Sequence, residues 1–77
     1  MKIEYVIATV NTNRYFCGFE KKGGEPKLRH INFPGEREVY EECLAAEKEI
    51  ERILDRYTGS EELRLKIEKH YVKEDTY

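Results

Sequence analysis

The sequence has no tryptophan, only two prolines and two cysteines, and no long apolar run. A membrane-spanning helix needs about 18 consecutive apolar residues, and a signal peptide needs a basic N-terminal region followed by an apolar one. Neither pattern occurs, so we expect a cytoplasmic protein with no membrane contact. Cys17 and Cys43 form no CxxC pair. We expect both to be small buried side chains in a reducing compartment.

Charge is abundant, at 39% of residues, while aromatic residues still reach 12%. This balance favours a folded core under a heavily solvated surface and argues against disorder. The length predicts a single domain, 1–77, with one modest core and a frayed tail at 73–77. Residues 1–35 carry six Lys or Arg against three Asp or Glu, whereas residues 36–57 carry four against eight. The first half is therefore mildly basic, and the acidic segment after it is either a solvated face or a nucleic-acid mimic.

An amphipathic helix is predicted from about residue 36 to residue 57. The apolar positions recur at alternating steps of four and three, the spacing of one helical face. No Ser or Thr marks the start of the helix, so its first residue is placed only within a few positions. The residues of the stripe are Val39, Cys43, Ala46, Ile50, Ile53 and Tyr57, with Tyr40 and Leu54 beside it.

Residues 2–10 predict a central strand, because apolar side chains occupy both of its faces. Asn11, Thr12 and Asn13 supply a turn, and residues 14–21 return as a second strand. A three-residue loop with Asn13 in the left-handed region pairs Ile7 with Cys17.

This register also pairs Tyr5 with Phe19 and fixes the two faces of the hairpin, although a slip of one residue would exchange them. The core face then holds Ile3, Tyr5, Ile7, Tyr15, Cys17 and Phe19. The opposite face holds Val6, Ala8, Val10 and Phe16, with Gly18 among them.

Two further strands complete the prediction. Gly23-Gly24-Glu25-Pro26 is a turn signal, and residues 27–31 form a short third strand that begins at a sheet edge. Residues 63–72 alternate apolar and charged side chains, as in a strand with one solvated face; a second helix is the alternative. The predicted fold class is α+β, in the order ββ(β)αβ, with the helix on one sheet face. If the last strand pairs beside the first, it lies parallel to it and leaves the first strand central.

Catalytic and metal sites are not expected. Structural zinc sites bring ligands in close pairs, whereas Cys17, His30, Cys43 and His70 are widely separated. Nothing in the local sequence places a thiol beside a base and an oxyanion hole. We therefore predict a protein that is not an enzyme and that needs no cofactor.

The sheet face left uncovered by the single helix is the predicted contact surface. Its residues are Val6, Val10, Phe16 and Arg14. The partner is expected to be a second copy of the chain, a host protein, or both.

The alternative prediction is a nucleotide or nucleic-acid binder. Lys21, Lys22, Lys27 and Arg29 flank the glycine turn, and a basic hairpin with nearby aromatic residues can hold phosphates and stack bases. The net charge of −2 argues against a dedicated nucleic-acid domain.

Most of the chain resembles small accessory proteins of phages and prophages in its size, composition and order of elements. The resemblance lies in Tyr5-Val6-Ile7, the RYFCGF strand, the glycine turn, the charged helix EECLAAEKEIERIL and the final LRLKIEKHYV strand. Some proteins of that kind inhibit bacterial defence systems, in the manner of anti-CRISPR proteins. They bind a nuclease complex stoichiometrically or sequester a nucleotide signal. The resemblance thus implies a phage protein that binds and blocks a host defence component.

Overall fold

The computed structural model describes residues 2–21, 24–30 and 37–72. These residues form five strands and one helix in the order β1 (Lys2–Thr9), β2 (Arg14–Phe19), β3 (Pro26–His30), β4 (Val39–Tyr40), α1 (Cys43–Arg56) and β5 (Leu65–Val72). All strand pairs are antiparallel. The fold class is therefore α+β, as predicted.

β1 is the central strand, as its two apolar faces predict. One of its edges pairs with β5 along its whole length. The other edge is shared by β2, whose Tyr15 lies opposite Ala8, and by the two-residue β4. β3 pairs with β2 and forms an edge of the sheet, in agreement with the position of Pro26 as its first residue.

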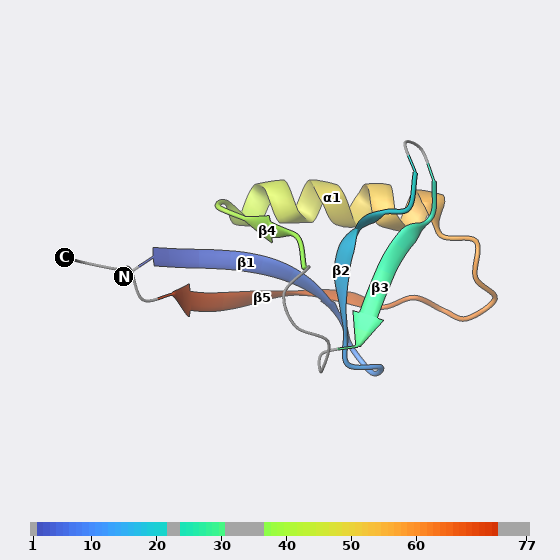
Figure 1. The fold of residues 1–77 in the computed structure, drawn as a ribbon, viewed down its shortest axis with the longest axis horizontal. Coiled ribbons are helices and arrows are strands. Elements are labelled where there is room, and N and C mark those ends of the chain that lie inside the picture. The colour runs from blue at the N-terminus through green and yellow to red at the C-terminus, as the bar shows by residue number, and fades with distance from the viewer. Residues whose placement is uncertain (1, 22–23, 31–36, 73–77) are drawn as a thin grey trace.

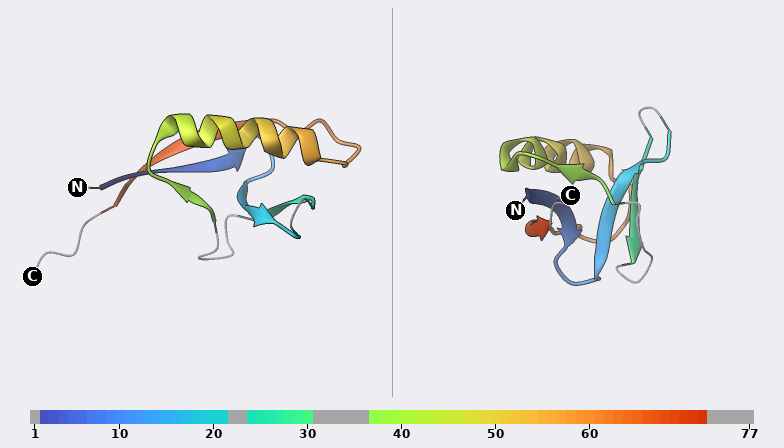
Figure 2. Two further views of the ribbon diagram at one scale, coloured as in Figure 1. Left: turned by 90° about the horizontal axis from the view of Figure 1, so that it is seen from above. Right: turned by 60° about the vertical axis from the view of Figure 1, so that its left-hand side comes forward.

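The sheet bends into a corner that the helix fills. Figure 1 shows β2 and β3 crossing β1 and β5 steeply, with α1 lying along β1. In the right panel of Figure 2 the helix lies over β1 and β5, with β2 and β3 to one side of it. The buried core joins Ile7 of β1 and Phe16 of β2 to Ala46 and Ile53 of the helix. The partly buried side chains around it are Tyr5, Phe19, Leu28, Tyr40, Ile50, Leu63, Leu65 and Ile67.

The register of the β1–β2 hairpin differs from the prediction by one residue. Ala8 lies opposite Tyr15, so the predicted pairs of Ile7 with Cys17 and of Tyr5 with Phe19 are wrong. Phe16 consequently packs with Ile7 under the helix, although the prediction placed it on the opposite face.

A threonine explains the difference in register. Asn13 has the expected positive φ, at 52°. The hydroxyl oxygen of Thr9 accepts hydrogen bonds from the Arg14 backbone N–H at 3.0 Å and from the Thr12 hydroxyl at 2.7 Å. These bonds close a loop of four residues, 10–13, where the prediction had three.

The helix starts later than predicted. Residues 39 and 40 form β4 beside Tyr5 and Val6, and α1 begins only at Cys43. Its N-cap, Glu42, makes no side-chain capping bond, in agreement with the missing Ser or Thr. The predicted stripe is confirmed within the helix, where Ala46 and Ile53 are buried. The β-branched and aromatic pair Val39-Tyr40 favours the extended conformation that tertiary pairing stabilises here.

The last strand is confirmed, but it runs antiparallel to β1 and not parallel to it as predicted. The unpredicted β4 is the reason. After β4, the helix runs in the same direction as β1 (Figure 1), so the chain must turn back to form β5. The predicted tail, 73–77, lies outside the described residues.

Candidate binding surfaces

The helix-free face of the sheet is not an open apolar patch. Val6, Ala8 and Tyr15 form a second buried cluster there, and Val6 is only 1% exposed. Phe16 is also 1% exposed and lies on the other face. Of the four residues predicted to contact a partner, only Val10 and Arg14 are exposed, and both lie at the β1–β2 turn.

A polar network lies on this face, next to the second cluster. The Tyr15 hydroxyl donates to Glu68 Oε1 at 3.0 Å, and His70 Nε2 lies 3.0 Å from the same oxygen. Lys66 Nζ is 3.3 Å from Glu68 Oε2. The guanidinium of Arg37 lies 5.1 Å from the centre of the Tyr15 ring. Lys66, Glu68 and His70 alternate along β5, so the strand pattern in the sequence was the signal that placed them together.

The charge states of Glu68 and Tyr15 in this network are fixed at neutral pH. Burial raises the pKa of Glu68, but the contacts with His70, Tyr15 and Lys66 outweigh it, and the net pKa is lowered. Burial and the hydrogen bond to Glu68 raise the pKa of Tyr15. At neutral pH the carboxylate is therefore charged and the phenol is protonated, an arrangement that suits a fixed hydrogen bond more than proton transfer.

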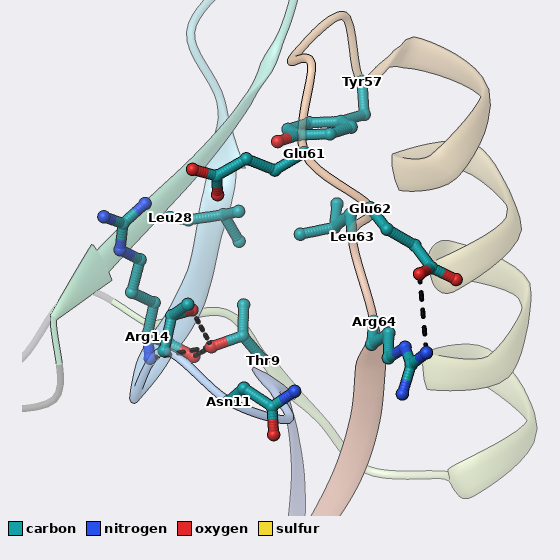
Figure 3. A pocket seen from close by; sticks show the side chains of 10 residues that line it. Thr9, Asn11, Arg14, Leu28, Tyr57, Glu61, Glu62, Leu63 and Arg64 are labelled. Carbon is teal, nitrogen blue, oxygen red and sulfur yellow. Dashed lines mark hydrogen bonds and ion pairs between the residues drawn. The ribbon is translucent and has the colours of Figure 1, made fainter.

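A hollow of about 330 Å³ opens at one end of β1, between β2 and the segment that leads into β5 (Figure 3). Leu28 and Leu63 face each other across it, and the ring of Tyr57 lies above Glu61. Its charged residues are Arg14 and Arg64 against Glu61 and Glu62. The Arg64–Glu62 pair is 3.4 Å apart. The balance of charge gives no preference for an anion or a cation.

A second hollow of about 360 Å³ touches the basic hairpin. It is lined by Arg14, Glu20, Pro26, Lys27, Leu28, Arg29 and Tyr57. The structure thus brings Lys27 and Arg29 of the predicted basic set together with Arg14. Lys21 is exposed and does not line this hollow, and Lys22 lies outside the described residues.

The outer edge of β5 is a long unpaired strand edge. Within residues 2–21, 24–30 and 37–72, no strand pairs with β5 on the side away from β1. Two exposed apolar residues, Ile3 and Tyr71, lie opposite each other near the end of this ladder, and Tyr71 is 62% exposed. The sequence-based prediction placed the last strand beside the first but considered only the faces of the sheet, and so it did not identify this edge as a binding surface.

One hydrogen bond fixes which peptide groups point outward from β5. The Val10 N–H donates to the Arg64 carbonyl at 3.0 Å, in the register that continues the β1–β5 ladder. In an antiparallel ladder, hydrogen-bonded pairs alternate with pairs whose N–H and C=O groups point away from each other. The peptide groups that bond to β1 are thus those of 66, 68, 70 and 72. The outward residues, whose peptide groups point away from β1, are Leu65, Ile67, Lys69 and Tyr71.

The cysteines and the remaining ligand-type side chains form no metal centre in the part of the chain that is described. Cys43 is exposed at the first residue of the helix, so the prediction that it is buried is wrong. Cys17 is half-buried. No helix among the described residues is long and apolar enough to cross a membrane.

No protein-family model matches this chain, and the searches of curated proteins and of solved structures found no match.

Proposed function

We propose that this protein is a non-enzymatic binding module that takes up an extended partner segment along the outer edge of β5. The observation that carries the proposal is the eight-residue length of this edge, which has no partner strand among the described residues. An exposed strand edge of this kind is a template for strand addition, in which main-chain hydrogen bonds supply affinity.

The side chains beside the edge support the same proposal. Ile3 and Tyr71 add exposed apolar surface at one end of the ladder, and Lys69 Nζ lies 5.6 Å from the centre of the Tyr71 ring. Alternate side chains of an added strand would contact such a surface and supply specificity. A stoichiometric inhibitor of a host defence protein, as the phage resemblance implies, is one kind of module that would use this edge.

A substitution that removes one outward N–H tests the proposal. We expect Lys69→Pro to leave the β1–β5 ladder intact, because proline is tolerated where a strand N–H faces solvent. Peptides selected from a random library on sparsely immobilised wild-type protein should bind Lys69→Pro at least about tenfold more weakly than Lys69→Ala. Selected peptides that bind both variants equally would place the binding surface elsewhere.

Nucleotide binding is the second candidate, and the hollow lined by Arg14, Lys27, Arg29 and Tyr57 favours it. Three cations beside a tyrosine ring suit a phosphate joined to a base. Titration with ATP and with a short single-stranded oligonucleotide at low salt should then give binding that weakens steeply as salt rises. Lys27→Ala should reduce it, whereas Lys48→Ala on the helix should not. Absence of binding at low salt would exclude this candidate.

A further inference from the structure

We infer that the segment taken up along β5 is the β5 strand of a second copy of this chain, in a two-fold dimer with Ile67 opposite its own copy. This inference rests on the proposed function, because it needs the outer edge of β5 to be the binding edge. It adds the identity of the partner and the register of the pairing.

The geometry of β5 suits pairing with itself. In a two-fold antiparallel pair of identical strands, residues that face each other must lie on the same side of the sheet, so odd residues meet odd residues. The outward residues are the odd ones, 65, 67, 69 and 71. With Ile67 opposite its own copy, the outward N–H and C=O groups of 65, 67 and 69 therefore meet those of 69, 67 and 65 in the second copy. β5 contains neither proline nor glycine, and its pairing with β1 is unbroken, so nothing in the strand interrupts such a ladder.

Several registers place the two-fold axis near the middle of β5, and the charges favour one of them. Centring the pair on Glu68 places that carboxylate opposite its own copy, and centring it on Lys69 does the same for two ammonium groups. Centring the pair on Ile67 places Lys66 opposite Glu68 twice, once on each side of the axis. Directly opposed like charges destabilise a sheet, and opposite charges stabilise it. Lys66 and Glu68 are already 3.3 Å apart within one chain, so the dimer would hold four alternating charges on the helix-free face.

The helix places an exposed apolar residue beside the same edge. Glu49 and Arg52 line a hollow with Phe16 and Tyr40, so this side of α1 faces β2 and β4. A helix turns about 100° per residue, and Leu54, five residues after Glu49, lies about 140° around it, on the β5 side. Leu54 is 48% exposed.

The position of the axis brings the two helices together. Ile67 belongs to the core packed under α1, so a two-fold axis at Ile67 passes beside the helix. The left panel of Figure 2 shows α1 lying along β1 and β5. The helix of the second copy would then lie antiparallel on the same side of the extended sheet, with Leu54 of each directed toward the other. Glu47 shares this side of the helix, so the contact would be mixed in polarity.

Light scattering across a concentration series tests the partner. We expect the wild-type chain to have twice the monomer mass at high micromolar concentration, and Lys69→Pro to raise the dissociation constant at least about tenfold relative to Lys69→Ala. Far-ultraviolet circular dichroism on each variant checks that it is folded. A wild-type monomer at all concentrations would overturn the second copy as partner while peptide binding at the edge survived. A dimer that Lys69→Pro leaves intact would overturn β5 as the dimer interface, while the peptide comparison decides the proposed function separately.

Cysteine crosslinking tests the register. In a background of Cys17→Ser and Cys43→Ser, oxidation of Lys66→Cys/Glu68→Cys should give a covalent dimer, because these positions face each other when Ile67 is on the axis. The matched control is Glu68→Cys/His70→Cys, in which positions 68 and 70 face each other only when Lys69 is on the axis. Preferential crosslinking of the control, or equal crosslinking by Glu68→Cys alone, would overturn the register centred on Ile67.

Discussion

Two of the edge strands among the described residues, β3 and β5, differ in regularity. β3 has five residues, begins with Pro26, and pairs with β2 through a register shift between Phe16 and Phe19, where Gly18 adopts a φ of 98°. β5 has eight residues in unbroken register with β1. Proline, bulges and short strands are the usual means by which sheet edges avoid pairing. β3 has all three, whereas β5 has none of them, and only its lysines disfavour pairing. β5 is therefore the edge better suited to pairing with another strand.

The core that supports both edges should show the largest effect. Phe16→Ala is expected to lower the free energy of unfolding by about 3–5 kcal/mol, because it empties a fully buried aromatic site between the helix and the sheet. Urea denaturation measures the change. Val10→Ala is the control, with an expected loss below about 1 kcal/mol, since Val10 is exposed. Equal losses for the two variants would mean that Phe16 is not buried between the helix and the sheet.

Two proline variants compare the inner and outer sides of β5. Glu68→Pro removes an N–H that bonds to β1 and should cost about 2–3 kcal/mol more than Glu68→Ala. Lys69→Pro removes an outward N–H and should cost no more than about 1 kcal/mol beyond Lys69→Ala. Thermal or urea unfolding of dilute protein measures both differences. The reverse order of the two effects would mean that the outward residues are assigned wrongly.

Gly18→Ala tests the irregularity of the β3 edge. The positive φ disfavours any residue with a Cβ, and a Cβ at this position would lie 3.1 Å from Glu38 Oε1. We expect a loss of about 1–2 kcal/mol in urea denaturation. In a Glu38→Ala background, Gly18→Ala no longer makes the side-chain contact, but the backbone strain remains. If the loss then vanishes, the contact and not the φ angle is the cause.

Glu68→Gln should lower the free energy of unfolding by about 1–2 kcal/mol at pH 7, no more than Gly18→Ala does. The cause is the loss of charged hydrogen bonds on the helix-free face. Because the folded pKa of Glu68 is lowered, its contribution is full above the ordinary carboxyl pKa of 4.5 and is lost as the pH falls through the folded pKa. The difference between wild type and variant should therefore shrink between pH 7 and pH 3. Glu62→Gln, in an exposed ion pair, is the control with little expected effect at either pH. A difference that is constant with pH would contradict the assigned role of the Glu68 charge.

The sequence predicted the elements better than their arrangement. The stripe of Ala46, Ile50 and Ile53 and the alternation after Leu63 are local patterns, and both are confirmed. The hairpin register depended on the hydroxyl of Thr9, which a residue pattern cannot place. β4 is only two residues long, and its residues fit the helical periodicity, so it was not predicted. Without β4, the direction predicted for β5 was the reverse of the observed one.

The predicted binding surface depended on that arrangement. The predicted register was wrong by one residue, so Phe16 lies in the core and not on the solvated face where the prediction placed it. Val6 is also buried. The basic residues Lys27 and Arg29 were identified from composition alone, but their proximity to Arg14 and Tyr57 required the folded chain. The open edge of β5 was not identified as a binding surface, because the prediction considered the faces of the sheet and not its edges, and because the direction of β5 depended on the unpredicted β4.

Amide hydrogen exchange of the outward residues, measured by NMR as a function of protein concentration, tests the central claim most directly. We predict that the amides of Ile67, Lys69 and neighbouring outward residues become protected as concentration rises, while the amides of β3 keep the same exchange rates. Exchange rates on β5 that do not change with concentration, or protection that appears first on β3, would contradict pairing of two copies along the outer edge of β5.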